Sequence, residues 1–164
     1  MRLTRLGDIY ALQGKYAEAE PLYKEALAIQ EKAFGERPAT ADTLSHLAAF
    51  YAVRGRYIDA EPTYKRALAI REKFLGPESF FVGDTLNNLG LVYLEEGRYA
   101  EAESLLKRAL AIMEKSFPPE HRYVVQSLMN VANLYYAQHK YTEAEPLSKA
   151  GMWTSKVARV RCLP

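Results

Sequence analysis

The sequence predicts an all-α solenoid, in which short helical pairs stack along one continuous core. Three observations predict it: a motif recurs about every 42 residues, its apolar residues follow helical spacing, and a glycine interrupts three of the four copies at the same place. The copies begin at Leu3, Leu44, Leu86 and Leu128. Because a unit this short cannot bury its own apolar face, successive copies must stack. We expect about four repeats and eight helices.

The first helix of each pair is marked by an apolar stripe with the spacing i, i+3, i+4, i+7. In the third copy this stripe is Leu86, Leu89, Gly90 and Tyr93. Its third member is always glycine or alanine, which lets a partner helix approach closely. The other stripes are Leu3, Leu6, Gly7 and Tyr10; Leu44, Leu47, Ala48 and Tyr51; and Leu128, Val131, Ala132 and Tyr135.

A turn and a longer second helix follow each stripe. Glycine suits this turn because it adopts left-handed backbone angles without a Cβ clash, and the four copies of the position are Gly14, Gly55, Gly97 and His139. The second helix is predicted to open at Tyr16, Tyr57, Tyr99 and Tyr141. It should run to about Phe34, Leu75 and Phe117 in the first three copies, where loops rich in glycine and proline begin.

The repeats are expected to form one array over residues 1–150, followed by a separate segment, residues 151–164. The predicted repeats are 1–41, 42–83, 84–125 and 126–150. The pattern fails near the end of the array, where Ser148 replaces an expected aromatic residue and Gly151 an expected alanine. Two interpretations stay open: a divergent last helix that caps the stack, or foreign or truncated sequence. The motif begins almost at Met1, which favours a segment of a longer array.

The composition is that of an ordinary folded protein, with 49% hydrophobic and 26% charged residues. Basic residues number 22 and acidic residues 20; three of the basic ones follow Gly151, so residues 1–150 are nearly neutral. This balance argues against a nucleic-acid partner. No apolar run is long enough to cross a membrane and no export signal is present, so we expect a cytoplasmic protein that does not bind membranes.

Residues for catalysis or metal binding are not grouped. The histidines, His46, His121 and His139, fall at unrelated places in the repeat, and the single cysteine is Cys162. No pair has metal-ligand spacing, and no glycine-rich phosphate loop occurs. We therefore expect no enzyme activity, no catalytic residues, no metal site and no cofactor.

The repeated residues resemble the tetratricopeptide repeat (TPR). The pattern is carried in the third copy by Leu86, Leu89, Gly90, Tyr93, Ala102, Leu106 and Ala109. The period of about 42 residues and the phrases GRYAEAE and LKRALAI are similar to the kinesin-light-chain type of this repeat. The resemblance implies antiparallel helix pairs in a right-handed superhelix, whose first helices line a concave groove that binds a protein or peptide.

Twelve residues are predicted to line that groove. If Leu86, Leu89 and Tyr93 face the second helix, the neighbouring stripe on the same helix faces the groove. The twelve are Thr4, Asp8, Ala11, Ser45, Ala49, Ala52, Asn87, Leu91, Leu94, Met129, Asn133 and Tyr136. Their side chains favour a partly apolar peptide or helix, with the Asn87 and Asn133 amides bonding its backbone. None is basic, which argues against a site for a terminal carboxylate.

Other interpretations remain. The leucines and the tyrosine of this stripe could simply belong to a wide core. The chain could also self-associate through an exposed apolar end face as a homo-oligomer, with Met152 and Trp153 at the interface. A third possibility is that it forms one segment of a larger regulatory protein with the same repeats.

Overall fold

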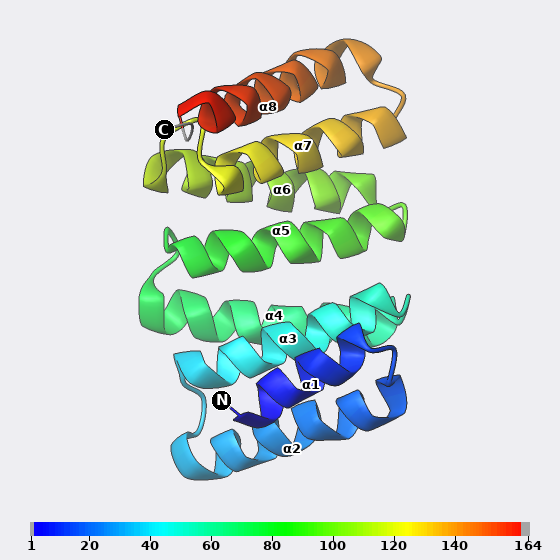
Figure 1. Cartoon of the computed structure of the whole chain (residues 1–164), viewed down its shortest axis with the longest axis vertical. Coiled ribbons are helices and arrows are strands. Elements are labelled where there is room, and N and C mark those ends of the chain that lie inside the picture. The colour runs from blue at the N-terminus through cyan, green and yellow to red at the C-terminus, as the bar shows by residue number, and fades with distance from the viewer. Residues whose placement is uncertain (1, 162–164) are drawn as a thin grey trace. The chain divides into compact units, whose positions relative to one another are not determined.

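The structure, a computed structural model, describes the backbone of residues 2–161 and the side chains of residues 2–151. Over that range the ordered elements are helices alone, eight in number, which confirms the prediction of an all-α fold (Figure 1). They are α1 (Arg2–Leu12), α2 (Tyr16–Phe34), α3 (Pro38–Val53), α4 (Tyr57–Leu75), α5 (Phe80–Glu95), α6 (Tyr99–Ser116), α7 (Arg122–Ala137) and α8 (Tyr141–Arg161).

The chain divides into two compact units, with the division inside α5, after Thr85. In the first unit α2 packs on both α1 and α3, and α3 packs on α4. In the second unit α6 packs on α7, and α7 packs on α8. Each unit thus contains first and second helices in alternation, joined by short turns (Figure 1).

The sequence placed the second helices more accurately than the first. All four second helices begin at the predicted tyrosines, and α2 and α4 end at Phe34 and Leu75 as predicted, whereas α6 ends at Ser116. The first helices α3, α5 and α7 begin about four residues before the predicted repeat boundaries at 42, 84 and 126. Their opening turns are buried, as at Thr40 and Ala41, but do not repeat in sequence, so self-similarity could not reveal them.

The core of the first unit combines small residues with aromatic ones. One cluster consists of Ala41, Leu44, Ala67 and Ile70, with the partly buried Leu27 against it. Beside it, the buried Tyr23 ring lies 5.6 Å from the Phe50 ring, centroid to centroid. Tyr23 can lie that close to α1 because the facing residue is Gly7, where an added Cβ would be 2.9 Å from the tyrosine ring.

Gly151, which departs from the repeated alanine, has a packing explanation. It is buried in α8, and a Cβ at this position would lie 3.0 Å from the Sδ atom of Met129 in α7. The residues equivalent to Met129 in earlier copies are the smaller Thr4, Ser45 and Asn87. A larger side chain on the first helix is therefore accommodated by a smaller residue on the second, and α8 continues as a helix to Arg161.

The turns between paired helices require left-handed backbone angles, as predicted. The φ angles at Gly14, Gly55 and Gly97 are 72°, 68° and 73°, and His139 adopts the same region with φ of 60°. Only glycine occupies this region without a steric penalty, so His139 is strained relative to its counterparts.

Replacing His139 by glycine is expected to stabilise the protein by about 0.5–1 kcal/mol, because the left-handed penalty disappears. The substitution also removes the exposed contact between His139 Nδ1 and the Tyr141 hydroxyl, 2.9 Å, but this loss offsets only a small part of the gain in stability. Thermal and urea unfolding measure the change. Gly97→Ala is the matched control and should destabilise, although a Cβ there meets no atom within 4 Å. A His139→Gly protein less stable than the parent would contradict the strain argument.

Candidate functional site

Five of the six residues predicted for the groove in the first unit are partly accessible. Asp8, Ala11, Ser45, Ala49 and Ala52 are all half-buried on α1 and α3. The sixth, Thr4, is buried, and its Oγ1 atom lies 3.3 Å from that of Thr43. Thr4 thus joins α1 to α3 instead of facing a ligand, which corrects the sequence-based assignment.

An apolar pocket of about 300 Å³ lies on this surface of the first unit. It brings together three of the predicted residues, Asp8, Ala11 and Ala49. Six further residues complete its lining: Leu12, Tyr16, Tyr23, His46, Phe50 and Val53. Leu12 and Val53 are the most open of these, with 88% and 82% of their surface exposed. The pocket therefore offers large apolar side chains to a partner.

A hydrogen-bonded acid lies at the edge of the pocket. The Tyr23 hydroxyl donates to Oδ1 of Asp8 at 2.8 Å, and His46 Nδ1 lies 3.0 Å from the same oxygen. Burial raises the pKa of Tyr23, and the Asp8 carboxylate raises it further. Two side chains from different helices thus fix the orientation of Asp8.

A second cavity, about 560 Å³, shares Tyr16 and Phe50 with the apolar pocket but is lined mainly by polar residues. Arg54 lies over the Tyr16 ring at 4.1 Å from its centroid, and Arg56 donates from Nη1 to Glu20 Oε2 at 2.8 Å. The hydrogen bond from Lys24 lowers the pKa of Glu20, and the bond from Arg56 lowers it further, against the opposing effect of burial. Charged groups therefore border the apolar pocket on one side.

The second unit carries the other six predicted residues, and one of them faces inward. Asn87 is buried; its Nδ2 donates to Ser127 Oγ at 2.6 Å, and its Oδ1 accepts from Asn130 at 3.3 Å. These bonds join α5 to α7, so the Asn87 amide is not offered to a ligand, contrary to the sequence-based assignment. The other five are accessible: Leu91, Leu94 and Met129 are half-buried, and Asn133 and Tyr136 are exposed.

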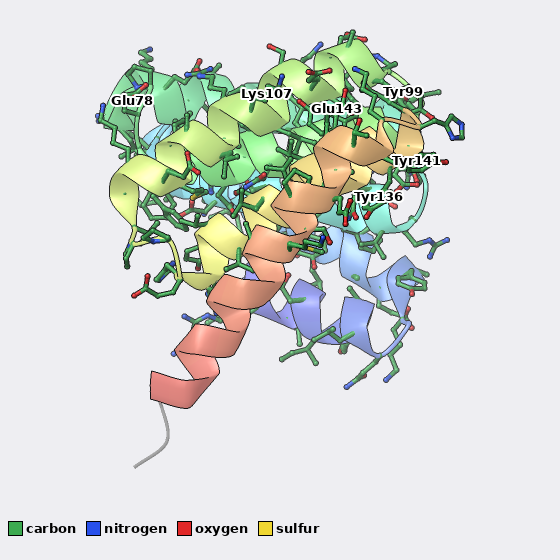
Figure 2. The ribbon with its side chains drawn as sticks, turned by 90° about the horizontal axis from the view of Figure 1, so that it is seen from above. Glu78, Tyr99, Lys107, Tyr136, Tyr141 and Glu143 are labelled. Atoms are coloured by element: carbon green, nitrogen blue, oxygen red, sulfur yellow. The ribbon has the colours of Figure 1, made fainter. Side chains whose placement is uncertain are left out.

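Tyr136 belongs to an aromatic pair at the turn between α7 and α8. Its ring centroid lies 6.0 Å from that of Tyr141, at a tilt of 50° (Figure 2). Both side chains are exposed, and Tyr141 also contacts the His139 ring. This pair gives the second unit an aromatic surface next to Asn133.

Sequence reasoning missed the largest apolar contribution to the site. Leu12 and Val53 lie at equivalent positions, nine residues after the first leucine of their copies, where the later copies have Glu95 and Ala137. The sequence did carry a signal for these two residues: each is a large apolar residue beside the turn, at a position that varies between copies. The predicted stripe stopped one residue short, at Ala11 and Ala52.

Across the described residues, no helix combines the length and apolar character that crossing a membrane demands.

Comparison with protein families gives one repeat type over most of the chain. The sequence model described as tetratricopeptide repeat matches residues 1–73, 39–115 and 81–151. A search of curated protein sequences finds no match.

Solved structures with helical repeats superpose on almost the whole chain. BtubC (BKLC) from P. vanneervenii is 24% identical, with a TM-score of 0.86 over 99% of this chain and 65% of its own. A putative kinesin light chain from Podospora anserina with nearly identical TPR-like repeats is 26% identical, with a TM-score of 0.82. The match covers 99% of this chain and 76% of the kinesin light chain. Aspartyl phosphate phosphatase F from Bacillus subtilis is 21% identical, with a TM-score of 0.82. The match covers 95% of this chain and 40% of the phosphatase chain. The chain thus spans less than two thirds of BtubC.

Proposed function

Because this chain belongs to the tetratricopeptide-repeat family, whose members generally mediate protein–protein interactions, we propose that its first helices bind a partly apolar peptide or helix. The family scaffold is typically non-enzymatic. In this proposal the chain is an interaction module, and each unit carries a binding surface of its own: the accessible residues of α1 and α3 in the first unit, and those of α5 and α7 in the second.

The observation that carries the proposal is the apolar pocket of the first unit. Leu12 and Val53 are almost fully exposed at its edge, next to the Tyr16 and Phe50 rings. A volume of about 300 Å³ is at the lower end of the range for ligand pockets, and it suits one large side chain of a peptide. Burying one apolar side chain there would contribute about 1.5–3 kcal/mol to binding.

Polar groups around the pocket would orient the ligand. Asp8 has a fixed position and can accept a hydrogen bond from a peptide N–H group. In the second unit, Asn133 is exposed three residues before Tyr136 on α7, and its amide can donate and accept hydrogen bonds. Apolar anchoring with a few hydrogen bonds is typical of helix-in-groove and extended-peptide recognition.

Val53→Asp tests the pocket. Peptides are first selected from a random displayed library on the unaltered protein, and their affinity is measured by fluorescence anisotropy. The carboxylate should weaken binding by about tenfold to a hundredfold, because the ligand side chain loses about 1.5–3 kcal/mol of apolar burial. Ile58→Asp, at an exposed position of α4 outside the pocket, is the control and should bind normally.

Both variants must unfold at temperatures close to that of the parent, since each replaced residue is exposed. Equal binding by Val53→Asp and the parent would refute the pocket as the site. So would a library selection that returns peptides without a shared apolar residue.

A further inference from the structure

The apolar pocket of the first unit has one acid in its lining, Asp8 of α1. Both described contacts of this carboxylate use the same oxygen: the Tyr23 hydroxyl donates to Oδ1 at 2.8 Å, and His46 Nδ1 lies 3.0 Å from it. Within the described residues, no hydrogen bond or ion pair reaches Oδ2, and the exposed Arg5, three residues earlier, is not paired with Asp8. The Asp8 side chain is 33% exposed. A fixed carboxylate therefore keeps one oxygen for a group that enters the pocket.

Asp8 differs from the neighbouring acids because its described ion pairs include no arginine or lysine. The buried Arg71 serves the other two acids: it donates to Asp42 at 2.9 Å and lies 3.8 Å from Asp84. Burial raises the pKa of Asp84, and Arg71 and His46 offset that effect only in part. The described partner of Asp8 is His46, which carries a charge only when protonated. Asp8 thus lacks the permanent counter-charge that its neighbours have.

Asp8 precedes the most exposed apolar residues of the pocket along both first helices. Leu12 follows Asp8 by four residues on α1, and Val53 follows His46, the α3 neighbour of Asp8, by seven. These spacings correspond to about 6 and 10 Å along a helix. An extended peptide covers such a distance in about two or three residues. A lysine or arginine at that spacing from an apolar anchor can lay its hydrocarbon stem along the pocket and bring its charged end to Asp8.

We propose that the peptide bound in the apolar pocket is extended and carries, about two or three residues from its apolar anchor, a lysine or arginine that binds Oδ2 of Asp8. This inference rests on the proposed function, because it describes the ligand of that same pocket. A hydrogen bond between charged groups is about twice as strong as a neutral one. The residues equivalent to Asp8 in the later copies are Ala49, Leu91 and Asn133, so the acid also distinguishes the first copy from the others.

Asp8→Asn tests the charge and keeps the packing, because asparagine has the same shape and its Oδ1 can still accept from Tyr23. Peptides are selected from the random displayed library on the unaltered protein. They should bind Asp8→Asn about tenfold more weakly, since the charged contact is lost. Asp59→Asn removes the same charge from an acid of α4 outside the pocket, and this control should bind like the parent. Both variants should unfold at temperatures close to that of the parent.

The basic residue of the peptide separates this inference from the proposed function. Its replacement by glutamine should weaken binding to the parent by about tenfold, and it should not weaken binding to Asp8→Asn further. An equal loss on both proteins would overturn the inference, because the cation would then bind elsewhere. Selected peptides that share an apolar residue but no basic one would also overturn it and leave the proposed function standing. Peptides that bind Val53→Asp as tightly as the parent would overturn both, since the pocket would not be the site.

Discussion

A Tyr23→Ala protein is expected to lose about 3–5 kcal/mol of unfolding free energy, the usual cost of removing a buried aromatic side chain. Tyr23 is 2% exposed, packs against Phe50 at 5.6 Å, and fills the space that Gly7 leaves on α1. The cavity would lie between all three helices of this region, so it cannot close by moving one of them. Urea unfolding monitored by circular dichroism measures the loss.

Tyr23→Phe separates packing from hydrogen bonding. The ring stays, and only the bond from the hydroxyl to Asp8, 2.8 Å, is lost. The expected cost is therefore about 0.5–1.5 kcal/mol. If Tyr23→Phe cost as much as Tyr23→Ala, the hydroxyl and not the ring would hold α2 to α1, and the packing argument would fail.

Leu106→Ala is expected to have a similarly large effect in the second unit, about 3–5 kcal/mol. The Leu106 side chain is fully buried between α6 and α5, where it lies against Gly90. A Cβ at position 90 would be only 2.8 Å from Leu106 Cγ, which is not the mobile end of the side chain. Gly90→Ala should therefore cost about 1–3 kcal/mol through overpacking.

The two changes should be strongly non-additive. In a Leu106→Ala background the clash is gone, and alanine is the better helix former by about 1 kcal/mol, so Gly90→Ala should then be neutral or stabilising. A double-mutant cycle of unfolding free energies measures this coupling. Additive costs would show that Gly90 is needed for some reason other than the approach of Leu106.

The sequence was sufficient for the helical pairs because their repeated residues are packing residues. Tyr16, Tyr57, Tyr99 and Tyr141 mark helix starts, and the left-handed turns follow from the glycines and from the position of His139. The opening turns of the first helices escaped prediction since their buried residues differ from copy to copy. Contacts that do not recur in every copy can be found only from the folded structure, which brings distant segments of the chain together.

Arg71 illustrates such a contact. It is buried in α4, where it donates to Thr85 Oγ1 at 2.6 Å, to the Phe81 carbonyl at 3.1 Å and to Asp42 at 2.9 Å. Its counterparts in the neighbouring copies are Gln30 and Met113, so the repeat gives no sign of a buried cation. The partners come from three different helical turns, and their meeting depends on the folded arrangement.

The sequence predicted only part of the candidate site, again because contacts between different repeats cannot be found from the repeated pattern. The stripe rule found Asp8, Ala11 and Ala49, which line the apolar pocket. It also selected Thr4 and Asn87, whose side chains bond inside the units. Helical spacing shows which residues share one face of a helix. Whether a residue on that face is buried depends on the first helix of the neighbouring repeat, which spacing alone does not place.

The most direct test of peptide binding is a map of the contact surface by nuclear magnetic resonance. A library-selected peptide is titrated into isotopically labelled protein, and amide shifts are followed for the assigned backbone. The proposed function predicts the largest changes at Ala11, Ala49 and Val53, beside the apolar pocket. Changes confined to the opposite exposed positions, such as Glu25 and Ile58, would contradict it, because the ligand would then occupy the second helices and not the first.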